Sequence, residues 1–315
     1  MPTLYTQRDS NIRKTWILIF SFLIFIIGFG WLFSYLTDSY AILVFAVILS
    51  ILMSFSSYWY SDKIVLAMTK AKPIEKKDNP ELYRLVENLC ITAGLPLPKI
   101  FILDESQPNA FATGRNSEHA VVAVTKGLLE KLERVELEGV ISHELAHIGN
   151  KDMLLGTVIV VLVGVVALLS RLFFRMTFYS RGRRREGGNL LFIFGIIAAI
   201  LAPVAAALIK LAISRKREFL ADATGALLTR YPEGLARALE KISFDATSME
   251  VANESTCHLF ISSPFKGEQS KNWFTKLFST HPPIKERIRA LRGMPSNTTS
   301  TGHRPIFVAK GDGRG

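Results

Sequence analysis

Two hydrophobic runs near the beginning of the sequence constrain its fold more than any other feature. Trp16–Leu36 and Tyr40–Tyr60 each extend over 21 residues without a charged side chain. Because a helix of about 20 apolar residues crosses the hydrocarbon core of a bilayer, we expect both runs to span a membrane as a helical hairpin within residues 1–60. The first run exceeds the apolar core of a signal peptide and leads into the second without a clear cleavage site, which indicates that it is retained.

Basic residues flank this hairpin at its two outer ends, whereas the turn Thr37-Asp38-Ser39 has none. They are Arg8, Arg13, Lys14, Lys63, Lys70, Lys72, Lys76 and Lys77. Since short cytoplasmic loops carry the excess of Lys and Arg, we expect both ends in the cytoplasm and the protein in the inner (plasma) membrane. The two cysteines, Cys90 and Cys257, are too few for a disulfide framework and agree with a reducing compartment.

The net charge of +11 is large enough to suggest nucleic acid as a partner. The basic residues, however, cluster beside hydrophobic segments, where they set topology and meet anionic lipid headgroups. The sequence has no Gly-rich phosphate loop and no RNA-binding signature. We therefore expect the lipid bilayer, and no nucleic acid, as a partner.

A ten-residue stretch, Val140–Gly149, contains the pattern His143-Glu144-Leu-Ala-His147. In a helix, residues four apart lie on one face, so both imidazoles can bind one ion, while Glu144 is turned about 100° aside. Two neutral imidazoles can hold Zn²⁺ and leave room for a water, whose proton a neighbouring carboxylate can accept. The pattern predicts a metallopeptidase centre with Glu144 as general base. The alternative is a solvated His–Glu face of a charged helix.

Catalytic zinc usually takes a third protein ligand. The metzincin continuation of the motif would require Gly at position 150 and His at position 153, but the sequence has Asn150 and Met153. A glutamate further downstream is the remaining common solution. Within Ser214–Asp222, Glu218 and Asp222 lie four apart on one helix face, suited to bind the ion and to orient a ligand, respectively. The alternative is an exposed helix whose carboxylates pair with Lys and Arg.

Four motifs, in this order, resemble the HtpX family of membrane zinc endopeptidases, whose relatives include the CAAX prenyl endopeptidases. They are Asn109-Ala-Phe-Ala112, His143-Glu-Leu-Ala-His147, Glu218-Phe-Leu-Ala-Asp222, and Thr280-His-Pro-Pro283 followed by Arg287. The resemblance covers roughly residues 10–292. It implies proteolytic quality control, with membrane or misfolded proteins as substrates. The ligands that it implies for one Zn²⁺ per chain, as in a gluzincin, are His143, His147 and Glu218.

The resemblance also implies roles for residues outside the ligand set. Asn109 and Ala110 are expected to contact the peptide substrate. His281 or Arg287 is expected to stabilise the oxyanion of the tetrahedral intermediate, because an imidazole and a cation can both do so. His258 is expected in a core or surface role, since three better-placed ligands are available.

Short apolar segments before the His-containing motif predict a small sheet. Lys99–Leu103, Asn109–Thr113 and His119–Thr125 have the β-branched and aromatic content of strands, and Gly114–Glu118 supplies a turn. We expect an antiparallel sheet just before the motif helix. An exposed edge strand of this sheet could pair with an extended peptide through backbone hydrogen bonds that tolerate many side chains.

Two further apolar runs, Met153–Ser170 and Asn189–Ile209, follow the motif and are joined by a loop that contains six arginines. Their lengths permit spanning, but spanning would place the arginines outside, against the positive-inside tendency. A spanning hairpin and a partly inserted one both remain open. Either keeps His143 and Glu218 on the cytoplasmic side, because the intervening chain crosses the bilayer twice or not at all.

The expected fold class is α+β: a mainly helical zincin-type catalytic domain with a small antiparallel sheet, plus two hydrophobic helical hairpins in the membrane. The expected units are an N-terminal transmembrane hairpin (1–60), a first catalytic part (61–152), a second hydrophobic hairpin (153–213), a second catalytic part with the third ligand (214–292) and a mobile tail (293–315). The expected function is an integral membrane zinc-dependent endopeptidase. The alternatives are a CAAX-type prenyl-peptide endopeptidase, whose relatives carry more spans, and a catalytically inactive membrane scaffold.

Overall fold

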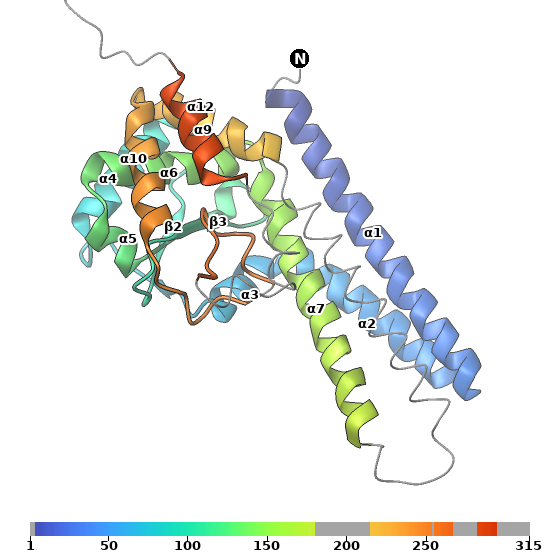
Figure 1. Ribbon diagram of the computed structural model, residues 1–315. Helices are drawn as coiled ribbons and strands as arrows, with labels where there is room; N and C mark the ends of the chain where they lie inside the picture. Colours follow the sequence, from blue (N-terminus) through green and yellow to red (C-terminus); the bar gives the residue numbers. More distant parts are fainter. Residues whose placement is uncertain (1–3, 180–214, 254, 267–281, 295–315) are drawn as a thin grey trace, which may run out of the picture.

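A helical hairpin forms the N-terminal part of the chain (Figure 1). The computed structural model describes residues 4–179, 215–253, 255–266 and 282–294, and begins with α1 (Leu4–Thr37) and α2 (Tyr40–Trp59). The chain reverses at Asp38, whose φ of 52° lies in the left-handed region that Asp tolerates. Ser10–Leu32 and Tyr40–Trp59 are long and apolar enough to cross a membrane, as predicted.

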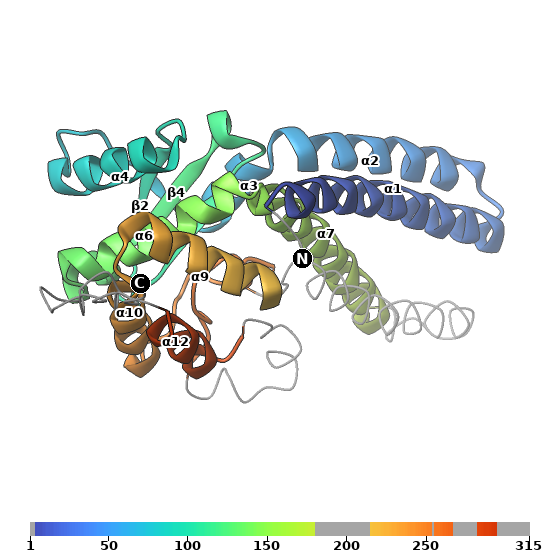
Figure 2. The same ribbon diagram turned by 90° about the horizontal axis from the view of Figure 1, so that it is seen from above.

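A third long helix, α7 (Asp152–Tyr179), lies beside this hairpin (Figures 1 and 2). One buried apolar cluster joins α1 to α7; it includes Leu18, Ile19, Phe22, Leu155, Ile159 and Leu162. The predicted apolar run Met153–Ser170 falls within α7. The run Asn189–Ile209 and the tail 295–315 lie outside the described residues, so the second membrane hairpin stays a prediction.

The small sheet has the strand order β1-β2-β4-β3. Its strands are β1 (Lys72–Pro73), β2 (Lys99–Leu103), β3 (Ala110–Thr113) and β4 (Val121–Thr125). The β3–β4 pair is antiparallel, as predicted, but β2 and β4 are parallel, so the sheet is mixed. The prediction of an entirely antiparallel sheet was wrong at this point because the chain passes from β2 to the edge strand β3 and returns through β4, which is buried along its whole length between them.

Further helices complete the domain around this sheet (Figure 2). They are α3 (Ser61–Met68), α4 (Pro80–Ala93), α5 (Lys126–Lys131), α6 (Arg134–Gly149), α9 (Arg215–Thr229), α10 (Pro232–Phe244) and α12 (Ile284–Arg292). The start of α4 follows the predicted signal: the Asn79 side chain accepts a hydrogen bond from the backbone N–H of Leu82, and Pro80 is the first helical residue.

Helix α6 lies in the middle of this domain and contacts β3, α4, α9 and α10. It begins with a reciprocal capping box, in which Glu133 and Glu136 each accept a hydrogen bond from the other's backbone N–H. At Gly139 the approach of α10 leaves no room for a side chain, since a Cβ there would lie 2.6 Å from the backbone N of Leu235. Most of α6 is therefore buried, and its polar side chains need partners inside the domain.

Candidate metal centre

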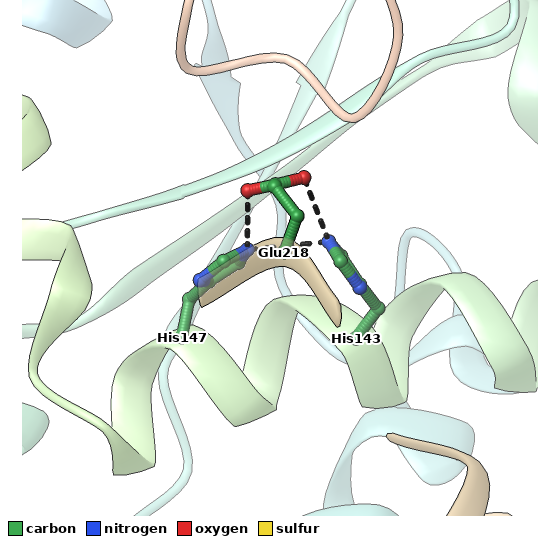
Figure 3. Close-up of side chains that lie close together, drawn as sticks. All are labelled: His143, His147 and Glu218. Carbon is green, nitrogen blue, oxygen red and sulfur yellow. Dashed lines mark hydrogen bonds and ion pairs between the residues drawn. The ribbon is translucent and has the colours of Figure 1, made fainter. Parts of the chain in front are cut away.

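The two histidines of α6 and one glutamate of α9 converge on a single point (Figure 3). The Nε2 atoms of His143 and His147 are 3.2 Å apart. Glu218 places Oε1 at 3.6 Å from His147 Nε2 and Oε2 at 4.0 Å from His143 Nε2. Ligand atoms of a tetrahedral zinc site with bonds of about 2.0–2.1 Å lie roughly 3.3 Å from one another. The donor set and its spacing therefore fit a zinc ion.

Close packing of α9 on α6 brings Glu218 to the histidines. A Cβ at Gly225 would lie 2.9 Å from the backbone N of His143, so this contact requires glycine. Glu218 lies two turns before Gly225, and Asp222 lies one turn before it. All three residues thus share the face of α9 that meets α6.

Each histidine has a carboxylate behind it. Asp222 Oδ1 lies 2.9 Å from His143 Nδ1, and Asp152 Oδ2 lies 3.2 Å from His147 Nδ1. A carboxylate that accepts the Nδ1–H of an imidazole fixes the tautomer in which Nε2 is free to bind a metal. The structure thus places Asp222 where a ligand-orienting acceptor was expected.

Sequence reasoning missed Asp152, the corresponding partner of His147. Asp152 follows His147 by five residues, a spacing that does not share a face in one continuous helix. The contact exists because α6 and α7 meet at a bend of 85°, with Lys151 in the left-handed region at φ 55°. The signal available in the sequence was the polar segment Asn150-Lys151-Asp152, which separates the motif from the apolar run that begins at Met153.

Arg287 of α12 lies behind the ligands and is fully buried. Its Nε and Nη2 donate to the two oxygens of Asp222 at 2.8 and 2.6 Å, and its Nη1 donates to the backbone O of Ile261 at 3.1 Å. Burial by itself would raise the pKa of Asp222, but Arg287 and His143 outweigh it and lower that pKa to about 2. Asp222 is therefore a carboxylate throughout the physiological range. His281, the other predicted oxyanion residue, lies outside the described residues.

Glu144 faces the cavity beside the ligands and is 2% exposed. Burial raises the pKa of Glu144 to about 7, while the nearby His147 and a hydrogen bond with the backbone of Ala112 oppose this rise. A carboxyl group with a pKa near neutrality can both accept and release a proton. Its position, one residue after His143, is the one expected for a general base.

The cavity at this point runs between α6, α7, α9 and the segment His258–Ile261. The described residues that line it are Ala112, His143, Glu144, His147, Asp152, Met153, Gly156, Arg217, Glu218, His258, Leu259, Phe260 and Ile261. His258 places Nε2 at 3.1 Å from the backbone O of Gly156, which agrees with the structural role expected for it. Sequence reasoning missed the wall formed by Leu259–Ile261, because its residues carry no chemical signature.

Asn109 and Ala110, the predicted peptide-contacting residues, are both buried and have partners within the chain. Asn109 Nδ2 donates to the backbone O of Ser262 at 3.0 Å, and the backbone O of Ala110 accepts from Ile261 N at 3.0 Å. The next alternate residue of β3, Ala112, lines the cavity instead. Substrate contact by Asn109 and Ala110 therefore stays a prediction, and Ala112 is a candidate that the sequence did not reveal.

Comparisons with known proteins identify a peptidase family. Residues 76–295 match Peptidase family M48. A "Protease HtpX homolog" of Dictyoglomus thermophilum is 46% identical over 93% of this chain and 95% of its own length, and one of Thermococcus sibiricus is 47% identical over 81% and 87%. The crystal structure of S. mikatae Ste24p aligns with 88% of this chain and 66% of that chain, at 22% identity and a TM-score of 0.47, a similarity too low to bear on function.

A pair of apolar helices long enough for a bilayer, together with a His/His/Glu group beside a buried glutamate, defines a membrane metalloendopeptidase. The chain belongs to Peptidase family M48. The relative from Dictyoglomus thermophilum, which it matches over 95% of that protein's length, is named as a homologue of the HtpX protease.

Proposed function

We propose that the protein is a zinc-dependent endopeptidase of the inner (plasma) membrane, with its catalytic domain in the cytoplasm, and that it cleaves membrane or misfolded proteins. The observation that carries the proposal is the group His143, His147 and Glu218, whose ligand atoms all lie within 4.8 Å of one another beside Glu144. The imidazole and carboxylate donors are those of a catalytic zinc site that keeps one position open.

The residues around the metal divide the work of hydrolysis among them. When bound, the ion supplies a Lewis acid that polarises water and the peptide carbonyl. Glu144 accepts the proton of the attacking water and delivers it to the leaving amine. Asp222 and Asp152 hold the Nδ1–H groups of His143 and His147, so that both Nε2 atoms point at the ion.

Arg287 and His281 take different parts in this proposal. The guanidinium of Arg287 contacts Asp222, Glu218, His143 and the backbone O of Ile261, and Arg287 is not among the described residues that line the cavity. We therefore assign it the positioning of Asp222. Stabilisation of the oxyanion then falls to His281, as the family resemblance implies.

The substrate is proposed to be an extended segment of a membrane or unfolded protein. The relatives are named as proteases of the HtpX type, and the cavity is bordered by Ala112 of the edge strand β3. Backbone groups of an edge strand bind a peptide without selecting its side chains. This mode of binding suits an enzyme that acts on many unfolded sequences.

Removal of the third ligand tests the zinc site directly. Glu218→Ala is expected to weaken zinc binding by more than about 100-fold, beyond the effect of changing an outer partner of a ligand, because two histidines alone leave the site incomplete. Zinc content and competition with a chelator measure this on the purified full chain in detergent. Glu138→Ala is the matched control, since Glu138 pairs with Arg134 on the outer face of the ligand-bearing helix. Unchanged zinc affinity in Glu218→Ala would place the third ligand elsewhere.

Cysteine labelling tests the orientation. A membrane-impermeant maleimide added to intact cells is expected to reach Ser39→Cys, in the turn between α1 and α2, but not Ser243→Cys on the exposed surface of α10. The native Cys90 and Cys257 are buried and give little background. Labelling of Ser243→Cys from outside would refute the cytoplasmic assignment. A probe at Gly182, outside the described residues, distinguishes a spanning second hairpin from a partly inserted one.

A further inference from the structure

A buried asparagine lies at the beginning of the first apolar helix. Asn11 is 0% exposed and is the second residue of the candidate span Ser10–Leu32 in α1. An amide buried in this way needs hydrogen-bond partners for its N–H and C=O groups. The identity of those partners indicates what the side chain does.

The partners of Asn11 come from two other helices and the bend between α6 and α7. Its Nδ2 donates to Asp152 Oδ1 and, at 3.4 Å, to the backbone O of Asn150. Its Oδ1 accepts from Arg217 Nη1 at 3.4 Å, and Arg217 Nε lies 3.7 Å from Asp152 Oδ1. Asn11, Asp152 and Arg217 thus form a polar cluster, each member less than a tenth exposed.

This cluster reaches a metal ligand through Asp152. One carboxylate oxygen of Asp152 accepts from Asn11, and the other lies 3.2 Å from Nδ1 of His147. Asp152 is on α7, beyond the bend that ends α6, so the backbone hydrogen bonds of α6 do not fix its position relative to His147. Contacts from outside α6 must hold this carboxylate in place.

The packing of α1 makes it a suitable anchor. Beyond Asn11, an apolar face of α1 that includes Leu18 and Phe22 packs against Leu155 and Ile159 of α7. Figure 1 shows the first turns of α1 beside the beginning of α9, which carries Arg217 and Glu218. The polar cluster therefore lies where the membrane hairpin, the bend and the ligand-bearing helix α9 meet.

We infer that Asn11 is a positioning residue for the metal ligand His147 and acts through Asp152, so that the N-terminal membrane hairpin completes the metal centre. This inference rests on the proposed zinc site. It gives the hairpin a role besides anchoring, because a displacement of α1 relative to α7 would change the orientation of His147.

A comparison of zinc affinities tests the inference on the full chain in detergent. Asn11→Leu keeps a buried side chain of similar size but donates no hydrogen bond, and we expect it to weaken zinc binding by about 10-fold. Asp152→Ala is expected to weaken it by about 10- to 100-fold. Because Asn11 acts through Asp152, the double variant should bind zinc no more weakly than Asp152→Ala alone.

Thr15→Val is the matched control. Thr15 lies one turn along α1, is 2% exposed, and donates to the backbone O of Asn11 within its own helix. It should bind zinc like the parent. Asn11→Ser, whose side chain is too short to reach Asp152, replaces Asn11→Leu if the latter does not fold.

Three outcomes would overturn the inference while leaving the zinc site intact. The first is parent-like zinc affinity in Asn11→Leu when Asp152→Ala is impaired. The second is a double variant in which the two effects multiply, which would mean that Asn11 acts independently of Asp152. The third is a Thr15→Val variant as weak as Asn11→Leu, which would indicate a general disturbance of α1. A parent protein that binds no zinc would instead refute the proposed function, and this inference with it.

Discussion

The Glu144→Gln variant is expected to bind zinc like the parent protein and to hydrolyse casein about 10²- to 10⁴-fold more slowly. Glutamine fills the same space, 2% exposed beside the ligand His143, but its amide can neither accept the proton of the attacking water nor return one to the leaving amine. Casein is a suitable substrate because it is unfolded and can adopt the extended form that an edge strand binds. Cleavage is followed on gels, and zinc content is measured on the same preparation.

Glu136→Gln provides a matched control for this change. Glu136 lies on the same helix, is 1% exposed, and accepts from the backbone N of Glu133 at 2.8 Å and from Lys241 at 2.7 Å, away from the metal ligands. Its replacement should lower stability by about 1 kcal/mol, as expected for a helix cap, and leave hydrolysis within a few-fold of the parent. An equal loss of casein hydrolysis in both variants would mean that replacing a buried carboxylate of α6 disturbs the fold, and that the effect of Glu144→Gln is not specific to proton transfer. Casein cleavage by Glu144→Gln within severalfold of the parent would remove the general-base assignment.

The residues on α6 could be predicted from the sequence because a single helix determines their geometry. His143 and His147 are four residues apart, so any α-helix places them on one face, and Glu144 then lies at a fixed angle to both. Glu218 was harder to predict as a ligand, because its contact with the histidines depends on the packing of two helices. Its place on a helix face could be predicted from the sequence, and its pairing with the two histidines was implied by the resemblance. Its contact relies on Gly225, whose importance becomes visible only in the packed structure.

The features that the sequence did not predict depend on changes of chain direction. Asp152 reaches His147 only because the chain bends by 85° after α6. The parallel pairing of β2 with β4 follows from the chain visiting the sheet edge at β3 before it returns. Asn11 contacts Asp152 across 141 positions of sequence, and no local pattern signals such a contact. In each case the sequence shows the type of residue or strand, but its partner in the fold could not be predicted.

The partners of the charged side chain of Arg287 were likewise not predictable from the sequence. Its place after the His281-containing motif indicated a cation near the reaction, and the structure does bring it to the metal centre. Its side chain, however, is fully buried and donates to both oxygens of Asp222, and Glu218 Oε2 lies 3.5 Å from its Nη1. These contacts are the reason for our proposal that Arg287 positions Asp222, and they depend on the packing of α12 against α9 and α10.

Replacing Arg287 by methionine should destabilise the protein by about 3–5 kcal/mol, because it leaves the buried carboxylate of Asp222 without its cation. For a chain of 315 residues, such a loss corresponds to a thermal midpoint lower by roughly 5–8 °C. The midpoint is measured in detergent with a chelator present, so that altered zinc binding does not contribute. Zinc affinity should fall as well, since Asp222 then orients His143 less firmly.

Arg292→Met, on the same helix, separates the effect of burial from the loss of a positive charge. Arg292 pairs with Glu233 and Glu240, but its side chain is 43% exposed, so water can replace those contacts and the midpoint should fall much less than in Arg287→Met. Adding Asp222→Asn to Arg287→Met should restore much of the midpoint, because most of the cost lies in the uncompensated charge of Asp222, which the double variant lacks. If Arg287→Met unfolds at the same temperature as Arg292→Met, the buried pair does not hold α12 in place, and the positioning role of Arg287 fails with it.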